Sequence, residues 1–203
     1  LHLAAIMRNK GRLLALDIHA WKLAELRKRA SRAGVDIIEA REIEGSKTVK
    51  RLAQKADRVL LDVPCSGMGV LRRNPDAKWK LSDVEIDRLI ALQAEILESY
   101  SRMVAPGGKL VYATCSILPS ENERQVQAFL AKHGEEWTLE EELHRTPETG
   151  AFDGFYAARL MRKAAEKNEE PKVANVEESP NDEVVPNDEV VPNDEAAPAA
   201  PGV

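Results

Sequence analysis

The sequence predicts an α/β fold in which a mostly parallel sheet carries helices on both faces. Short apolar runs of strand length alternate with helix-length stretches whose apolar residues recur every three or four positions. The runs at residues 12–17 and 58–62 end in aspartate, and the run at 109–115 ends in cysteine. Ligands of such sheets bind beyond the carboxyl ends of the strands. The sequence therefore predicts a functional site at that edge.

The predicted elements follow one another along the first 163 residues. Strands are predicted over residues 12–17, 35–40, 58–62, 109–115, 137–143 and 154–161. Helices are predicted over residues 1–7, 20–33, 47–55, 82–104 and 121–132. Gly34 ends the second helix, Ser82 caps the fourth, and Ser120 opens a capping box for the last. Residues 106–108, Pro-Gly-Gly, form the turn before the fourth strand.

Residues 164–203 differ from the rest of the chain. They contain no aromatic residue, and three copies of a proline-containing six-residue unit occupy residues 180–197. Proline interrupts both helix and sheet, and too little apolar surface remains to offset the entropy of ordering the chain. The sequence thus predicts one folded domain, residues 1–163, followed by a disordered acidic tail, residues 164–203. Binding of a partner by the repeats is the alternative.

The charge of the chain is divided unevenly. Two lysines and eleven acidic residues give the predicted tail a net charge of −9, so the whole-chain value of −5 leaves +4 for the remainder. A mildly basic domain is compatible with nucleic-acid binding. The sequence has no run of 18 apolar residues, no visible signal peptide and no metal-ligand spacing of its two cysteines. We therefore expect a cytoplasmic monomer with reduced thiols, without a membrane span or a bound metal.

Three groups stand at predicted strand ends. Asp17 could accept both ribose hydroxyls of a nucleoside cofactor, although capping the next helix explains it equally well. In residues 62–67, Asp-Val-Pro-Cys-Ser-Gly, the proline keeps the chain extended, so that Asp62 and Cys65 are held close together. A plain loop with an inert buried cysteine is the simpler alternative. If the strands before Cys65 and Cys115 are neighbours, both thiols face one cleft; a structural disulfide or two core cysteines are the alternatives.

Two segments carry a specific resemblance. Residues 61–79, LDVPCSGMGVLRRNPDAKW, and 112–123, YATCSILPSENE, resemble the fourth and sixth motifs of the Sun-type (Fmu-like) RNA cytosine carbon-5 methyltransferases. Residues 146–159, with Asp-Gly-Phe-Tyr at 153–156, resemble the eighth motif. The resemblance covers residues 1–163, and both cysteine motifs occur in order.

The resemblance implies a class I methyltransferase fold, S-adenosyl-L-methionine as cofactor, and RNA, most commonly ribosomal RNA, as substrate. It implies that Cys115 attacks carbon 6 of cytosine, which makes carbon 5 nucleophilic. It further implies that Cys65 assists breakdown of the covalent adduct, that Asp62 lies near cofactor and base, and that Asp17 holds the cofactor ribose. Glu44 stands nearest to the position of a family acid that contacts adenine.

The loop after Cys65 is rich in cationic residues. It contains Arg72, Arg73, Lys78, Trp79 and Lys80, of which the cations suit phosphates and the tryptophan suits an unstacked base. The alternative is that Trp79 fills the core and only the charged residues meet water.

The chain departs from the family at its beginning. The glycine-rich first motif and the N-terminal RNA-binding segment are not found, so we expect the central strand, between those at residues 12 and 58, to be missing. A non-catalytic RNA-binding remnant is therefore the alternative function. An amino-methylating enzyme of the same fold would instead have a polar-Pro-Pro-aromatic sequence at residues 62–65.

Overall fold

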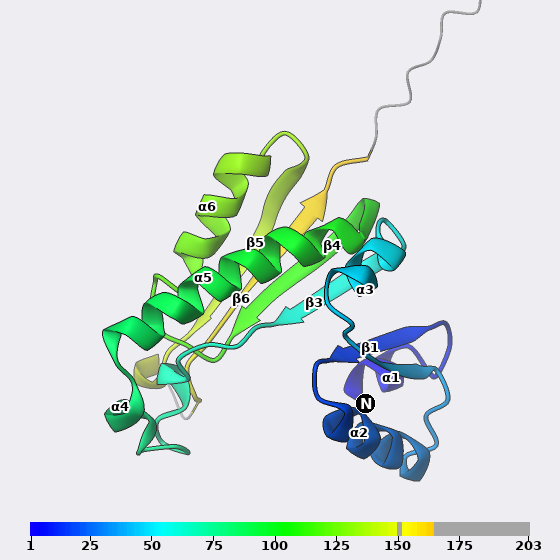
Figure 1. Cartoon of the computed structure of the whole chain (residues 1–203), viewed down its shortest axis with the longest axis horizontal. Helices are drawn as coiled ribbons and strands as arrows, with labels where there is room; N and C mark the ends of the chain where they lie inside the picture. The colour runs from blue at the N-terminus through cyan, green and yellow to red at the C-terminus, as the bar shows by residue number, and fades with distance from the viewer. Residues whose placement is uncertain (150–151, 165–203) are drawn as a thin grey trace, which may run out of the picture. The chain divides into compact units, whose positions relative to one another are not determined.

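The computed structural model describes residues 1–149 and 152–164 of the 203-residue chain. Except for Ala164, the predicted tail lies outside the described residues, and its disorder stays a prediction. Within the described part, helices and strands alternate as expected, which confirms the mixed α/β class (Figure 1).

The first sheet has two parallel strands, β1 (Leu13–Asp17) and β2 (Ile38–Glu42). Helix α1 (His2–Ile6) precedes it, and α2 (Ala20–Arg32) connects its strands and packs against them. Leu23 and Ala30 of α2 are buried, whereas Trp21 is 68% exposed. Two residues along a helix turn the side chain by about 200°, which places Trp21 opposite the Leu23 stripe.

The second sheet has four strands in the order β3-β4-β6-β5. Their bounds are β3 (Ala56–Asp62), β4 (Val104–Thr114), β5 (Trp137–Arg145) and β6 (Phe155–Arg162). Strands β3 and β4 are parallel, whereas β6 is antiparallel to both β4 and β5. The short elements that accompany this sheet are α3 (Ser46–Leu52), η1 (Met68–Val70), α4 (Ala77–Lys80), η2 (Ser101–Met103) and η3 (Pro147–Thr149).

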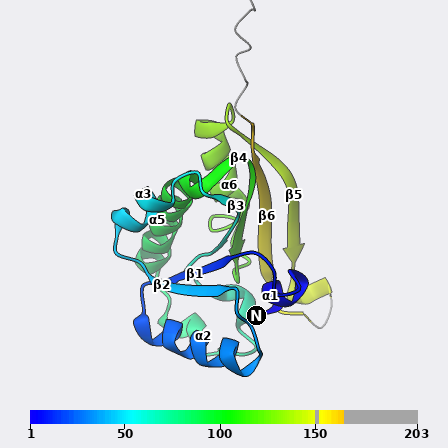
Figure 2. The same ribbon diagram turned by 90° about the vertical axis from the view of Figure 1, so that its right-hand side faces the viewer.

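The main core lies on one face of this four-stranded sheet. Helices α5 (Asp83–Tyr100) and α6 (Glu123–His133) both lie on that face (Figures 1 and 2). The core includes Leu61, Leu97, Leu110, Tyr112, Val126, Phe129, Trp137, Ala158 and Leu160. This packing supports the ends of β3 and β4, where the cysteine motifs begin.

The two sheets are not hydrogen-bonded to each other in the described part of the chain. Strands β1 and β3 do not pair, so the predicted gap between them is not closed by direct pairing. All five residues of β1 are only half-buried, and Leu60 on β3 is 55% exposed. Both strands therefore leave apolar side chains accessible that a central parallel strand would normally bury.

Three local expectations have different outcomes. Ser82 caps α5 as predicted, because its hydroxyl accepts a hydrogen bond from the Glu85 N–H at 3.3 Å. Residues 106–108 lie within β4 rather than before it. Between two successive residue pairs of the β3–β4 ladder, β4 contains three more residues than β3, and in this irregular stretch Gly107 has a φ of +77°. The prediction that Ser120 caps the last helix is wrong. Helix α6 starts at Glu123, and the preceding Glu121 and Asn122 are buried.

Among residues 1–149 and 152–164, no helix combines the length and the apolar character needed to cross a lipid bilayer.

Candidate active site

The two cysteines lie together. Cys65 Sγ is 3.3 Å from Cys115 Sγ, both thiols are free, and both residues are half-buried. Strands β3 and β4 are parallel neighbours, with Asp62 opposite Ala113, so the chain leaves the sheet at the same level in both strands. The structure thus places the two thiols at one edge of the sheet, and neither a disulfide nor a fully buried core position describes them.

The contact between the thiols makes them chemically unequal. By accepting a hydrogen bond from Cys65, Cys115 has its pKa lowered to about 7, against the opposing effect of burial. The same hydrogen bond raises the pKa of Cys65 far above its usual range, and burial of the thiol adds to this effect. Cys115 is therefore the more readily ionised of the two thiols and is partly thiolate near neutral pH, which is the nucleophilic form of cysteine, whereas Cys65 stays a thiol.

Asp62 ends β3 with an exposed side chain. Its charge raises the pKa of Cys115, so the carboxylate is close enough to act on the thiol. Within the described residues its side chain forms no hydrogen bond or ion pair. Asp62 therefore has free acceptor oxygens in the neighbourhood of the cysteine pair.

A buried carboxylate connects the two cysteine loops. Glu121 is fully buried, and its Oε1 accepts from the Ser66 N–H at 2.8 Å and from Gln93 Nε2 at 3.0 Å. Its Oε2 accepts from the hydroxyl of Ser66 at 2.5 Å and from that of Ser116. Ser66 follows Cys65 and Ser116 follows Cys115, so one side chain holds both residues that follow the thiols.

Neighbouring polar residues complete this network. Asn122 accepts a hydrogen bond from the Thr114 hydroxyl at 2.5 Å and donates one to the Ser116 carbonyl at 3.0 Å. Gln93 on α5 also donates to the Pro64 carbonyl at 2.9 Å. In the described part of the chain, every buried polar side-chain atom has a hydrogen-bond partner. Complete pairing of this kind favours a single arrangement of the loops.

Two glycines bring a third loop to the cysteines. The Gly69 N–H donates to the Cys115 carbonyl at 3.0 Å, and the Gly154 N–H donates to the Gly69 carbonyl at 2.7 Å. A Cβ on Gly69 would lie 2.2 Å from the Gly154 oxygen, which leaves no room for a side chain. The segment that begins β6 is thus fixed against the Cys65 loop.

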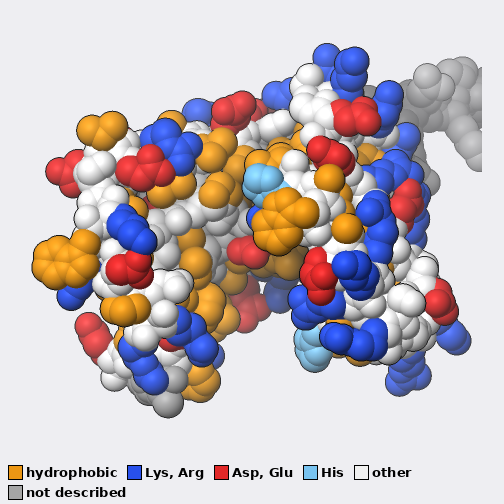
Figure 3. All heavy atoms as spheres, turned by 60° about the horizontal axis from the view of Figure 1, so that its bottom comes forward, with side chains coloured by type: hydrophobic (Ala, Val, Ile, Leu, Met, Phe, Trp, Pro, Cys, Tyr) orange, Lys and Arg blue, Asp and Glu red, His pale blue; other side chains and the backbone are white. Residues whose placement is uncertain are grey.

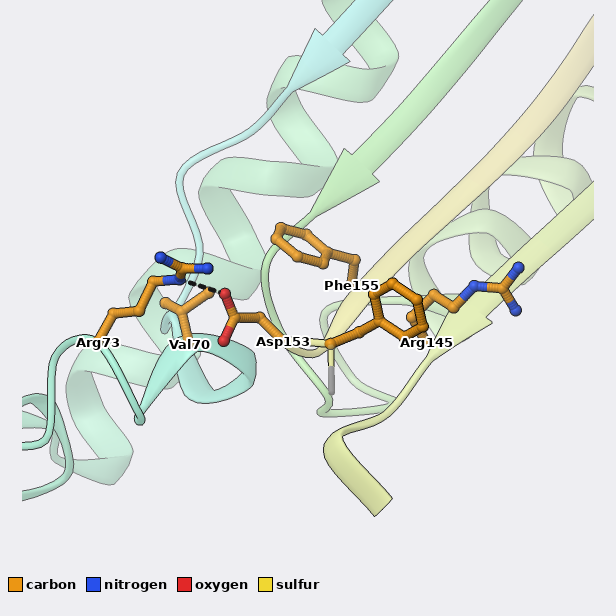
Figure 4. A pocket seen from close by; sticks show the side chains of 6 residues that line it. Val70, Arg73, Arg145, Asp153 and Phe155 are labelled. Carbon is orange, nitrogen blue, oxygen red and sulfur yellow. Dashed lines mark hydrogen bonds and ion pairs between the residues drawn. The ribbon is translucent and has the colours of Figure 1, made fainter. Parts of the chain in front are cut away.

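This third loop borders an open pocket of about 390 Å³ (Figure 4). Its lining residues are Val70, Arg73, Arg145, Phe152, Asp153 and Phe155. Arg73 forms an ion pair with the nearly buried Asp153, whereas Arg145, on the far side, forms none within the described residues (Figure 4). Phe152 is 63% exposed and Phe155 is 46% exposed. The pocket therefore combines accessible aromatic rings with guanidinium groups.

The cationic loop is exposed, and its tryptophan is not a core residue. Trp79 is 80% exposed, with the Lys78 ammonium 4.9 Å from its ring centre. Arg72, Lys78 and Lys80 are also exposed, and Lys80 forms an ion pair with Asp76. Basic and acidic side chains are interspersed over the face shown in Figure 3, with apolar side chains among them. On that face, basic side chains do not form one continuous patch.

Asp17 and Glu44 belong to the other part of the chain. Asp17 ends β1, accepts a hydrogen bond from the His19 N–H at 2.8 Å and lies 3.5 Å from Lys22 Nζ. Asp17 thus binds the N–H of the residue that precedes α2, although α2 itself has no side-chain cap, and its partly exposed carboxylate retains further acceptor sites. Glu44 has an exposed side chain, 3.7 Å from Arg51. Within the described residues, no contact joins either acid to the cysteine pair, and no cluster of metal-binding side chains occurs.

Comparisons of this sequence with a family profile and with curated proteins agree with one another. The sequence profile of the 16S rRNA methyltransferase RsmB/F family matches residues 1–161. A probable ribosomal RNA small subunit methyltransferase B from Synechocystis is 36% identical over 179 residues, which cover 79% of this chain and 40% of the relative. A ribosomal RNA small subunit methyltransferase B from Klebsiella pneumoniae is 41% identical over 168 residues, covering 76% and 37%. The chain thus spans about two fifths of the length of these curated relatives.

Two solved structures are also similar to this chain. The crystal structure of PH0851 superposes with a TM-score of 0.74 and 34% identity, covering 78% of this chain and 39% of that one. The structure of NSun6 from Pyrococcus horikoshii with SFG gives a TM-score of 0.70 and 26% identity, covering 79% and 44%.

Proposed function

Since this chain belongs to the 16S rRNA methyltransferase RsmB/F family, we propose that it carries the catalytic centre of an RNA cytosine carbon-5 methyltransferase, with Cys115 as the nucleophile. The observation that carries the proposal is the 3.3 Å contact between Cys65 and Cys115 at the ends of adjacent parallel strands. Ribosomal RNA is the proposed substrate class, because the relatives named above act in that class by name.

Cys115 suits the first covalent step. Its lowered pKa provides thiolate at neutral pH, and the thiolate sulfur forms a bond to carbon 6 of cytosine. The electron pair of the 5,6 double bond moves toward carbon 5, and the ring nitrogen takes up a proton or a hydrogen bond. Asp62 in its protonated form is the group proposed to donate to that nitrogen, and its carboxylate would then accept a hydrogen bond from the ring N–H. Carbon 5 then has the nucleophilic character that methylation needs.

Cys65 suits the last covalent step. Once carbon 5 is methylated, transfer of its proton to solvent water restores the double bond and expels Cys115 as a thiolate. The Cys65 thiol donates a hydrogen bond to that sulfur and thereby stabilises the leaving group. The role in product release that we assign to Cys65 follows from this donation.

S-adenosyl-L-methionine is the proposed methyl donor, and when bound it supplies an electrophilic methyl group. The NSun6 structure with SFG, an analogue of this cofactor, supports the assignment. In this chain, Asp17 and Asp62 both end parallel strands and retain acceptor oxygens, which fits the hydroxyl and amino donors of a nucleoside. Asp17 would hold the ribose, and Asp62 would lie between cofactor and base.

The pocket beside the cysteine loops supports an RNA substrate. Exposed rings at Phe152 and Phe155 suit stacking on unpaired bases, and Arg145 suits a phosphate. Val70 in the pocket is next to Gly69, which is hydrogen-bonded to Cys115. A nucleotide held there would be a close neighbour of the target cytidine.

Covalent trapping tests the proposal. The chain is incubated with S-adenosyl-L-methionine and RNA containing 5-azacytidine, and a protein–RNA adduct is detected on a denaturing gel. We expect the adduct with the wild-type chain and its complete loss in Cys115→Ala. An adduct that persists undiminished in Cys115→Ala would remove Cys115 from the role of nucleophile.

A further inference from the structure

We infer that Glu121 is a positioning residue that sets the separation of the Cys65 and Cys115 thiols. The inference deepens the proposed function and rests on it, because the thiol pair matters for catalysis only if that function is right. Glu121 contacts neither sulfur. It acts through the residues that follow them.

The hydrogen-bond geometry supports this role. Four donors reach the Glu121 carboxylate, which matches the number of its lone-pair sites. Two of the donors come from Ser66 and one from Ser116, each one residue beyond a cysteine. The two serine hydroxyls also lie 3.2 Å apart, so the carboxylate closes a small ring between the loops. A shift of either loop would break at least one of these bonds.

The location of the carboxylate argues against a purely stabilising role. Burying a carboxylate is costly unless it is fully paired, and apolar packing of the same volume is frequently as stable. The charge also opposes catalysis electrostatically, because Glu121 raises the pKa of Cys115, as Asp62 does. The largest influence on that pKa is the hydrogen bond from Cys65, which depends on thiol separation. The benefit of Glu121 therefore lies in geometry.

The two possible effects of Glu121 can be separated by substitution. In Glu121→Gln the charge is lost, but the amide oxygen can keep the bonds from the Ser66 N–H and from Gln93. The serine hydroxyls can rotate to accept from the new amide group, because a hydroxyl both donates and accepts. In Glu121→Ala the whole connection between the loops is lost. A role in positioning predicts opposite behaviour of the two variants.

The readout is the pH dependence of Cys115 alkylation by iodoacetamide in the full chain. Trypsin releases Cys65 in residues 59–72 and Cys115 in residues 110–124, so mass spectrometry follows each thiol separately. We expect Glu121→Gln to keep the titration midpoint of Cys115 or to lower it slightly. We expect Glu121→Ala to raise the midpoint and to slow alkylation at pH 7 by roughly tenfold. Glu95→Ala, which removes an exposed glutamate of α5, is the matched control and should change nothing.

A folded Glu121→Ala variant with an unchanged midpoint would overturn the inference, and so would a Glu121→Gln variant that behaves like the alanine variant. If Glu121→Ala does not fold, the double variant Ser66→Ala/Ser116→Ala removes both hydroxyl donors, and an unchanged midpoint there has the same meaning. Alkylation needs neither RNA nor cofactor. Absence of a 5-azacytidine adduct with the wild-type chain would therefore reject the proposed function. An unchanged Cys115 titration midpoint in Glu121→Ala would reject only the role of Glu121.

Discussion

The two sheets of this protein differ in how they hold their functional residues. The four-stranded sheet packs under α5 and α6, and its cysteine loops are joined by buried, fully paired polar groups. The two-stranded sheet has half-buried strands, and Asp17 at its end is held by one backbone N–H and a lysine at 3.5 Å. The difference indicates that the residues proposed for covalent chemistry are held by many buried hydrogen bonds, whereas the acid proposed to bind the cofactor is held by few contacts.

The largest expected effect is on stability, and it tests whether the four-stranded sheet is more tightly packed than the two-stranded sheet. Leu110 in β4 is fully buried, so Leu110→Ala should lower the free energy of unfolding by about 2–5 kcal/mol. Leu14→Ala in the half-buried β1 should cost about 1 kcal/mol, because less apolar surface is lost. Urea unfolding followed by circular dichroism measures both values. Equal losses would show that the two sheets are equally well packed.

The next effect concerns the thiol pair. Cys65→Ala removes the hydrogen bond that lowers the pKa of Cys115, so its thiolate should form at a higher pH than about 7, and alkylation at pH 7 should slow by roughly tenfold. The same variant should accumulate RNA adduct, because the leaving thiolate is less stabilised. Asp62→Asn should shift the pKa of Cys115 in the opposite direction, since the charge of Asp62 raises it. Identical profiles for wild type and Cys65→Ala would refute the proposed division of roles.

A smaller effect is expected at the two-stranded sheet. Asp17→Asn retains an oxygen for the His19 N–H and so should fold normally, but it loses a charged acceptor for the ribose. We expect S-adenosylhomocysteine to bind about five- to tenfold more weakly, or by about 1 kcal/mol. Isothermal titration calorimetry measures this change, with Glu39→Gln on β2 as a control. Unchanged affinity would leave Asp17 with its contact to the His19 N–H alone.

The smallest expected effect is on RNA binding, and it is tested by replacing one arginine in each of the two sheet regions. Arg145→Ala, in the pocket, should weaken binding of a short single-stranded oligoribonucleotide by about threefold and reduce the salt dependence by about one phosphate contact. Arg32→Ala on α2 removes the same charge from the other region and should have less effect. Fluorescence anisotropy at two salt concentrations distinguishes them. An equal loss from both variants would indicate non-specific attraction instead of a nucleotide site.

Much of the fold could be predicted from hydrophobic periodicity. The strands that end in Asp17, Asp62 and near Cys115 were expected because short apolar runs stop at polar residues. The position of residues 106–108 could not be predicted, because a Pro-Gly-Gly sequence can form a separate turn or an irregularity within a strand. The cap of α6 was also mispredicted, because a Ser-Glu-Asn-Glu sequence fits a capping box locally while tertiary contacts use Glu121 and Asn122 in the buried network.

The candidate site was predicted as individual residues and not as a network. The proximity of Cys65 and Cys115 followed from adjacent strand ends, but Glu121 carries no signal of burial in the sequence, since it lies in a polar stretch before a helix. Arg145 and Phe152 were missed for a different reason. They join the pocket only because β6 lies between β4 and β5, an order that periodicity does not determine.

The distribution of the three tryptophans has a practical consequence for spectroscopy. Trp137 is buried in the four-stranded sheet and packs edge-on against Phe129, Trp21 is exposed on α2, and Trp79 protrudes from the cationic loop. Each therefore emits from a different environment, with Trp137 at the shortest wavelength. Single-tryptophan versions of the chain would report separately on the main core, on the first sheet and on the loop beside the pocket. Quenching confined to Trp79 would be the direct optical signal of a base stacking on that loop.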